Sequence, residues 1–196
     1  MERQETVLRL SINFRGKAVP YAPQNHGISI NQGFKCLKGK LELVDDIPEA
    51  QDNDNLRNAL TLLNSQNTAF FTVGCEKSFN KEKDQCLEKP YWAKGFLDVS
   101  FNAKKLVSDA ANYFVLFFQF NEYVRKHSFK EHVLYEWELV GANFTDAACS
   151  GWTACIWVTT GYLVTEAESR KVWGKAIDFL VEFLKNIPVG PYEKIY

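Results

Sequence analysis

The sequence lacks the motifs by which most enzyme classes are identified. It contains no G-x-x-x-x-G-K-[ST] phosphate loop, no G-x-G-x-x-G, no H-E-x-x-H and no G-x-S-x-G. Histidines are also scarce, with only three, His26, His127 and His132. We expect these to be solvated or to lie at the ends of helices, because no neighbouring motif assigns a base or a ligand role to any of them. The motifs therefore indicate no enzyme class and no family.

Long hydrophobic runs and an excess of one charge are missing too. The longest apolar stretch, Tyr113 to Phe118, is far too short to span a bilayer, and the first residues carry no apolar run typical of a secretion signal. The net charge of -1 and the pI near 6.3 provide no positive field that would attract phosphate backbones or anionic lipid. We expect a cytoplasmic protein with no membrane partner and no nucleic-acid partner.

The cysteines lack the spacing of a zinc site or a redox dithiol. They number five, are widely separated and include no C-x-x-C pair: Cys36, Cys75, Cys86, Cys149 and Cys155. We expect most of them to be reduced and several to be core residues.

The segment 42–54 is rich in Asp and Glu and has no Lys or Arg. Oxygen ligands at this density suit calcium or magnesium, but the calcium-loop pattern also requires a central Gly and a terminal Glu, and both are missing. A solvated linker leading into a helix, or a docking site for a basic partner, is the alternative interpretation. We therefore predict no metal and no cofactor.

Aromatic residues are what the sequence has in abundance, at 14% of 196 residues. Each ring brings a large apolar area that must be covered by core, ligand or partner. Hydrophobic residues at 46% and charged residues at 24% are typical of a globular protein. A chain of this length can be organised around one core, and we predict a single α+β domain over residues 1–196.

Alternation of apolar and polar residues predicts about six strands. They are Thr6–Phe14, Phe34–Val44, Thr68–Cys75, Tyr91–Phe101, His132–Asn143 and Gly151–Leu163. The segments between them that are rich in turn residues, or that mix both charges, are predicted to be exposed loops.

Helical spacing predicts three helices. The first contains Leu56 to Leu63 and is capped by Asp52 or Asn53; the last begins at Thr165, which forms a capping box with Glu168. Residues 103–126 fit a helix by length, although alternating Phe residues leave a strand as the rival. The order strand, strand, helix then recurs three times, which predicts a largely antiparallel sheet with two or three helices on one face. The other face is solvated or used for binding.

The last predicted hairpin provides the main candidate site. A register that pairs Val133 with Tyr162 and Trp137 with Val158 makes one face continuously apolar. The opposite face then carries Glu136, Glu138, Thr153, Trp157 and Thr159. Carboxylates at i and i+2 lie about 7 Å apart along a strand, a spacing that suits acid and base roles in glycoside hydrolysis. A plain solvent face and a partner-binding face with a tryptophan anchor are the other interpretations.

We therefore expect a non-enzymatic protein-interaction module, such as an inhibitor, an immunity-type protein or an adaptor, which binds a protein through Trp157, Glu136 and Glu138. The alternative is a small hydrolase or transferase that uses Glu136 and Glu138, or Cys75 with a histidine. A homo-oligomer through Tyr113 to Phe120 or the last helix is also predicted, because segments this apolar are hard to cover in a two-layer domain.

Overall fold

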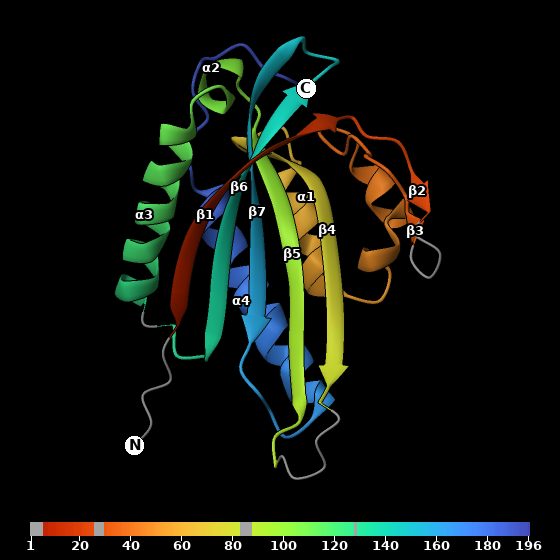
Figure 1. Ribbon diagram of the computed structural model, residues 1–196, viewed down its shortest axis with the longest axis vertical. Coiled ribbons are helices and arrows are strands. Elements are labelled where there is room, and N and C mark those ends of the chain that lie inside the picture. The colour runs from red at the N-terminus through yellow and green to blue at the C-terminus, as the bar shows by residue number, and fades with distance from the viewer. Residues whose placement is uncertain (1–5, 26–29, 83–87, 128) are drawn as a thin grey trace.

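The computed structural model describes residues 6–25, 30–82, 88–127 and 129–196, and the predicted α+β class is confirmed. The central sheet is made of β1 (Val7–Val19), β4 (Phe70–Lys81), β5 (Tyr91–Phe101), β6 (Val133–Phe144) and β7 (Cys149–Thr160). The strands lie in the order β1-β6-β7-β5-β4 (Figure 1). Two short strands, β2 (Gln24–Asn25) and β3 (Ile30–Asn31), pair with each other. The helices are α1 (Asp54–Leu63), α2 (Lys104–Val107), α3 (Ala110–His127) and α4 (Glu166–Lys185), with the 3-10 helices η1 (Leu41–Asp46) and η2 (Pro48–Ala50).

The sheet is mixed, with five strands in place of the predicted six and one parallel pair. β1 runs parallel to β6, and the other neighbours are antiparallel. The predicted strand Phe34–Val44 is wrong, because this segment is a loop followed by η1. Gly39 has a φ of +71°, which a strand does not allow, and the side chain of Lys38 turns inward and is buried. The strand-strand-helix order therefore fails in its first unit.

Hydrogen bonds of the Lys38 side chain, and not the pairing of a strand, hold this segment against the rest of the fold. Its Nζ donates to the backbone oxygens of Ser65, Thr68 and Phe70 at 2.7, 2.9 and 2.6 Å, and to Thr68 Oγ1 at 3.0 Å. Burial lowers the pKa of Lys38 to about 8, with a smaller contribution from Lys194. The oxygen acceptors oppose that effect by stabilising the ammonium. Four oxygen acceptors thus surround the three N–H groups of one buried ammonium and fix the segment against the start of β4.

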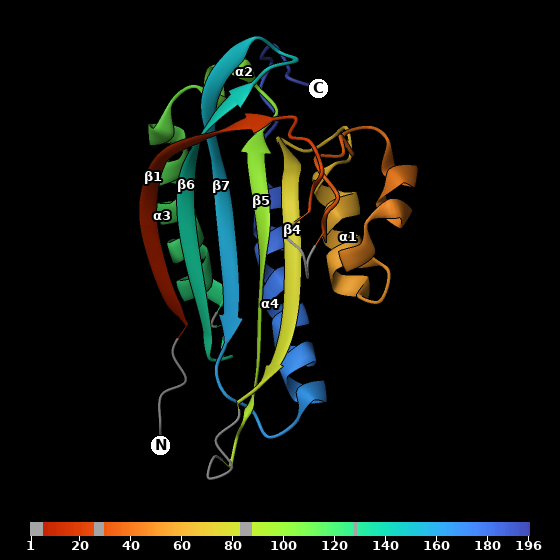
Figure 2. The same cartoon turned by 45° about the vertical axis from the view of Figure 1, so that its right-hand side comes forward.

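Helices α1, α3 and α4 cover one face of the sheet (Figure 2). Their starts follow local rules: Asn53 Oδ1 accepts from the Leu56 amide at 2.8 Å, and the predicted capping box of Thr165 and Glu168 is confirmed. The largest fully buried side chains lie where these helices meet the sheet, and they include Trp137, Trp173, Tyr113, Tyr135 and Phe120. In the described residues, no helix has both the length and the apolarity to cross a membrane.

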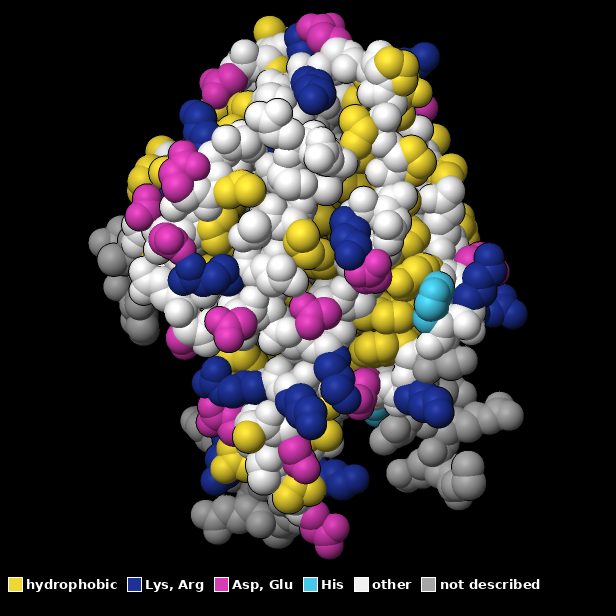
Figure 3. Space-filling model, turned by 180° about the vertical axis from the view of Figure 1, so that it is seen from behind, with side chains coloured by type: hydrophobic (Ala, Val, Ile, Leu, Met, Phe, Trp, Pro, Cys, Tyr) yellow, Lys and Arg dark blue, Asp and Glu magenta, His cyan; other side chains and the backbone are white. Residues whose placement is uncertain are grey.

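The predicted helix over 103–126 is confirmed as α2 followed by α3, and the strand alternative is wrong. Tyr113, Phe117, Phe120 and Val124 are buried, as their helical spacing predicts. Figure 3 shows the helix side, where hydrophobic side chains gather between charged ones. On α3, Val115 is 55% exposed and Phe118 is 60% exposed, while the apolar stripe of α4 is buried. The predicted self-association surface is thereby reduced to the outer face of α3, and self-association stays a prediction.

Candidate functional site

The face of the sheet opposite the helices carries the predicted site residues. Trp157 pairs with Glu136 and Cys155 pairs with Glu138 across β6 and β7. The predicted register is wrong by two residues, since Val133 pairs with Thr160 in place of Tyr162. Because side chains alternate with a period of two, an even shift keeps every residue on its predicted face. We call this surface the open face.

Trp157 is the largest aromatic residue at the centre of the open face. Its ring packs edge-on against Phe96 of β5 with the centroids 4.7 Å apart, and Lys94 Nζ lies 4.4 Å from the Trp157 centroid. The register explains this cluster, because Phe96 and Trp157 are direct cross-strand partners. The ring is half-buried beside its sheet neighbours. Part of the Trp157 ring is therefore accessible from the solvent on the open face.

The two carboxylates of β6 each have a partner on β1. Arg9 Nη1 lies 3.4 Å from Glu136 Oε1, and Asn13 Nδ2 donates to Glu138 Oε1 at 2.9 Å. Arg9 and Glu136 are a direct register pair, as are Ser11 and Glu138. Both carboxylates thus form part of a polar border between β1 and β6, next to Trp157.

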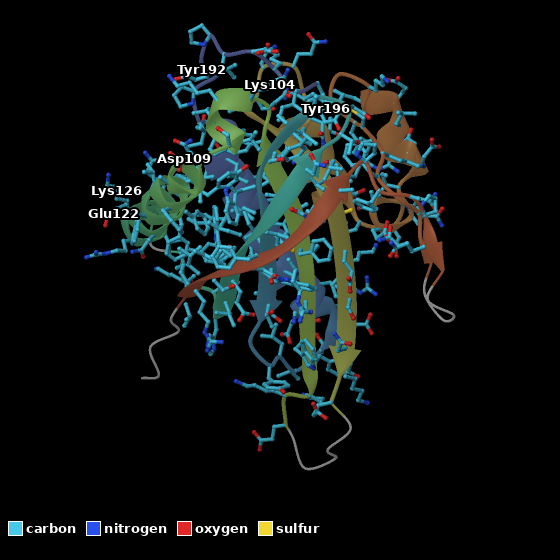
Figure 4. All side chains as sticks on the ribbon, turned by 45° about the horizontal axis from the view of Figure 1, so that its top comes forward. Lys104, Asp109, Glu122, Lys126, Tyr192 and Tyr196 are labelled. Atoms are coloured by element: carbon cyan, nitrogen blue, oxygen red, sulfur yellow. The ribbon has the colours of Figure 1, made fainter. Side chains whose placement is uncertain are left out.

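The end of β1 and the residues after it cross in front of the sheet. After a register shift between Asn13 and Lys17, β1 stays paired with β6 as far as Val19 and Phe144. Lys17 Nζ forms an ion pair with Asp98 of β5, and the Tyr21 hydroxyl donates to Val73 O of β4 at 3.0 Å. Figure 4 shows this crossing from the upper side, with the end of β1 passing in front of β5 and β4. We call residues 15–21 the strap. It covers one end of the open face and leaves the end with Trp157 uncovered.

Asp98 is the buried charge beneath the strap, and only 6% of the residue is exposed. Its Oδ2 contacts Lys17, whereas Asp98 Oδ1 and the nearby Thr153 Oγ1 have no hydrogen-bond partner among the described residues. Asp98, Lys17 and Phe96 were missed in the sequence. A single acidic residue within the apolar strand from Gly95 to Phe101 is the pattern that points to Asp98.

Cys75 does not have the surroundings of a nucleophile. Burial raises the pKa of the Cys75 thiol to about 12, and the charges of Glu49 and Glu76 act in the same direction. His132 precedes β6 and is separated from β4 by β7 and β5, while His127 Nδ1 lies 3.0 Å from Tyr123 O at the end of α3. His26 and Cys86 lie outside the described residues.

The acidic segment 42–54 folds as η1, η2 and the start of α1. Asp45 pairs with Arg57, Asp46 with Lys35, and Asp52 with Lys77. Across the described part of the chain, no three His, Cys, Asp or Glu side chains converge in a way that could hold a metal ion.

No family model, no curated protein and no solved structure matches this chain. The open face and its residues are therefore the basis on which a function can be argued.

Proposed function

We propose that the protein is a non-enzymatic binding module that docks another protein on the open face, with Trp157 as the central anchor. The observation that carries the proposal is the aromatic pair Trp157–Phe96, half-buried on a sheet face that no helix covers in the described structure. Tryptophan in a partly desolvated position is the residue type that most often dominates the free energy of protein association.

The charges around the pair suggest the chemistry of the partner. Glu76, Glu136 and Glu138 lie on the same face, while Lys94 stacks on the Trp157 ring and Arg9 pairs with Glu136. The carboxylates outnumber the basic groups, so the expected partner presents an apolar side chain with Lys or Arg beside it. Carboxylates at the rim of such a contact act mainly on the association rate and its salt dependence.

The hydrolase alternative has less support. Glu136 and Glu138 already have partners on β1, and the raised pKa of Cys75 disfavours the thiolate that a nucleophile needs. No observation on the described residues favours catalysis over binding at these positions.

The experiment is a quantitative affinity capture from the native cell with three forms of the protein: wild type, Trp157→Ala and Phe118→Ala. Phe118 is the matched control, since it is an exposed aromatic residue on α3, on the opposite side of the sheet. We expect a protein that wild type and Phe118→Ala retain equally and that Trp157→Ala loses. A capture profile that Trp157→Ala leaves unchanged would contradict the proposal.

A further inference from the structure

A cavity of about 410 Å³ lies beside the outer edge of β4, apart from Trp157. Its walls come from segments far apart in the sequence: β4 residues 72–76, the loop 31–37, residues 47–49, and the side chains of Tyr21, Leu60 and Phe96. This volume is in the range of pockets that hold small organic ligands. We call it the β4 cavity.

The wall formed by the loop is held in place by specific contacts. The Phe34 amide donates to Tyr21 O at 2.9 Å, and the Gly33 amide donates to Asn31 Oδ1 at 2.9 Å. Gly33 has a φ of +81°, and a Cβ there would lie 2.8 Å from Pro23 N, so this turn requires glycine. Together with the bond from Tyr21 to Val73 O, these contacts make the cavity a preformed feature of the fold.

The rings of Tyr21 and Phe96 line the cavity next to Gly74, the position at which β4 has no side chain. A Cβ on Gly74 would lie 3.2 Å from the Tyr21 hydroxyl oxygen and 3.7 Å from Phe96 Cε2. Glycine at this position therefore lets both Tyr21 and Phe96 approach the strand closely. Aromatic rings that line a cavity attract cations through their electron-rich faces and offer apolar contact as well.

The charge of the lining is negative. Glu49 and Glu76 line the cavity, and among the described residues neither carboxylate has a hydrogen bond or an ion pair. Lys35 is the basic residue of the lining, but its Nζ donates to Asp46 O at 2.9 Å and lies 3.7 Å from Asp46 Oδ2. The neighbouring Lys77 forms an ion pair with Asp52. Two carboxylates that are in no ion pair thus line the cavity. Burial lowers the pKa of the neighbouring Lys77, and the charge of Glu49 opposes that effect, but the ion pair of Lys77 is with Asp52.

The charge of Glu49 acts on the pKa of Tyr21, whose side chain forms part of the cavity wall. Burial raises the pKa of Tyr21 to about 12, and the charges of Asp98, Cys75 and Glu49 add to this effect. Glu49 itself is half-buried on η2, so its charge is partly shielded from water. A carboxylate in that position gains more from a cationic partner than an exposed one does.

We propose that the β4 cavity binds a small organic cation, an amine, amidine or guanidine carried on an apolar body. The charged end contacts Glu49 and Glu76, and the apolar body packs against Phe96, Tyr21 and Leu60. Anionic ligands are disfavoured by the same two carboxylates. The proposal does not rest on the protein-docking role of Trp157, although Phe96 and Glu76 lie at the border of both surfaces.

The test uses benzamidine as the probe, with benzamide as its neutral analogue of the same shape and benzoate as the anionic one. Binding is followed by ¹H–¹⁵N correlation spectra of the full chain. We expect benzamidine to shift the amides of residues 72–76 and 33–37 and to bind about tenfold or more tighter than benzamide, because hydrogen bonds to a charged partner are the strong ones. Benzoate is expected to leave these amides unchanged.

Glu49→Gln removes the charge while keeping the shape, and we expect it to weaken benzamidine binding about tenfold and to leave benzamide unaffected. Glu42→Gln is the matched control, because Glu42 is an exposed carboxylate of the same acidic segment outside the cavity lining. Glu76→Gln, on an exposed side chain, repeats the test without disturbing the half-buried position.

Three results would each overturn the proposal: equal affinity for benzamidine and benzamide, shifts confined to other parts of the chain, or benzamidine binding unchanged in both the Glu49→Gln and the Glu76→Gln variants. Trp157→Ala separates this proposal from the docking proposal. It is expected to abolish partner capture while it leaves the preference for benzamidine over benzamide in place, because Glu49 and Glu76 are retained, so either result can fail without the other.

Discussion

The two faces of the central sheet are built from alternate residues of the same strands, yet their surroundings are opposite. Tyr135, Trp137 and Ile156 point toward the helices and are fully buried, whereas their direct neighbours Glu136 and Trp157 point to the open face. Of any two consecutive residues in this part of β6 or β7, one therefore lies in the core and the other on the proposed docking surface. If the open face binds a partner as proposed, single substitutions in one hairpin should separate stability from binding.

The largest difference in the free energy of unfolding is expected when one tryptophan is removed from each face. Trp137→Ala is expected to lower the free energy of unfolding by about 3–5 kcal/mol, the usual cost of deleting a large buried ring. Trp157→Ala is expected to cost about 1 kcal/mol, mainly the edge-on contact with Phe96. Urea denaturation measures both. Equal losses from the two substitutions would mean that the open face is part of the core.

A buried lysine outside both faces provides the second test. Lys38→Met is expected to lower the free energy of unfolding by about 2 kcal/mol, because it leaves the carbonyl oxygens of Ser65, Thr68 and Phe70 without their buried donor. Lys40→Met is the control, since Lys40 is exposed in the same segment. Thermal or urea unfolding that does not distinguish the two variants would contradict the fastening role of Lys38.

A smaller effect is expected at the start of α4, which lies on the helix-covered face. Thr165→Ala removes the oxygen that accepts from the Glu168 amide at 3.1 Å and should cost about 1 kcal/mol. Val164→Ala, one residue earlier and exposed, serves as the comparison. An unfolding midpoint and slope that stay at the wild-type values in Thr165→Ala would show that the cap contributes nothing measurable.

The smallest effect is expected from thiol chemistry at Cys75. With a pKa of about 12, roughly one thiol in ten thousand is ionised at pH 8, because the thiolate fraction falls tenfold for each unit of pKa above the pH. Cys149 is half-buried like Cys75, but the charge of Lys104 opposes the rise that burial causes in the pKa of Cys149. Iodoacetamide should therefore label Cys75 more slowly than Cys149, and the rate at Cys75 should rise with pH through pH 10. Peptide mass spectrometry follows both sites. Fast labelling of Cys75 at neutral pH would revive the nucleophile hypothesis.

The parts of the fold that depend on local chemistry are predictable from the sequence. The bounds of β5 and the start of α4 agree with the expectation, because alternation and a capping box act within a few residues. The face on which Glu136, Glu138 and Trp157 lie is predicted too, although the register is not. A period of two determines the face, whereas the turn geometry around Ala148, with a φ of 49°, sets the register.

The parts that depend on distant contacts are not predictable from one sequence. The parallel pairing of β1 with β6 joins residues more than a hundred positions apart, and no local pattern specifies it. The strap depends on Lys17 meeting Asp98, and the loop that replaces the predicted strand Phe34–Val44 depends on Lys38 meeting Thr68. The cavity beside β4 also depends on distant contacts, those of Tyr21 with Phe34 and Val73, which explains why the sequence does not indicate it.

In the proposed function the open face binds a partner while the helix-covered face maintains the fold. The most direct measurement is the dissociation constant of the captured partner for wild type and Trp157→Ala, by isothermal titration calorimetry, together with the free energy of unfolding of the same two proteins. We predict that Trp157→Ala raises the dissociation constant about thirtyfold or more and lowers the free energy of unfolding by only about 1 kcal/mol. An unchanged dissociation constant in a folded Trp157→Ala protein would contradict the account.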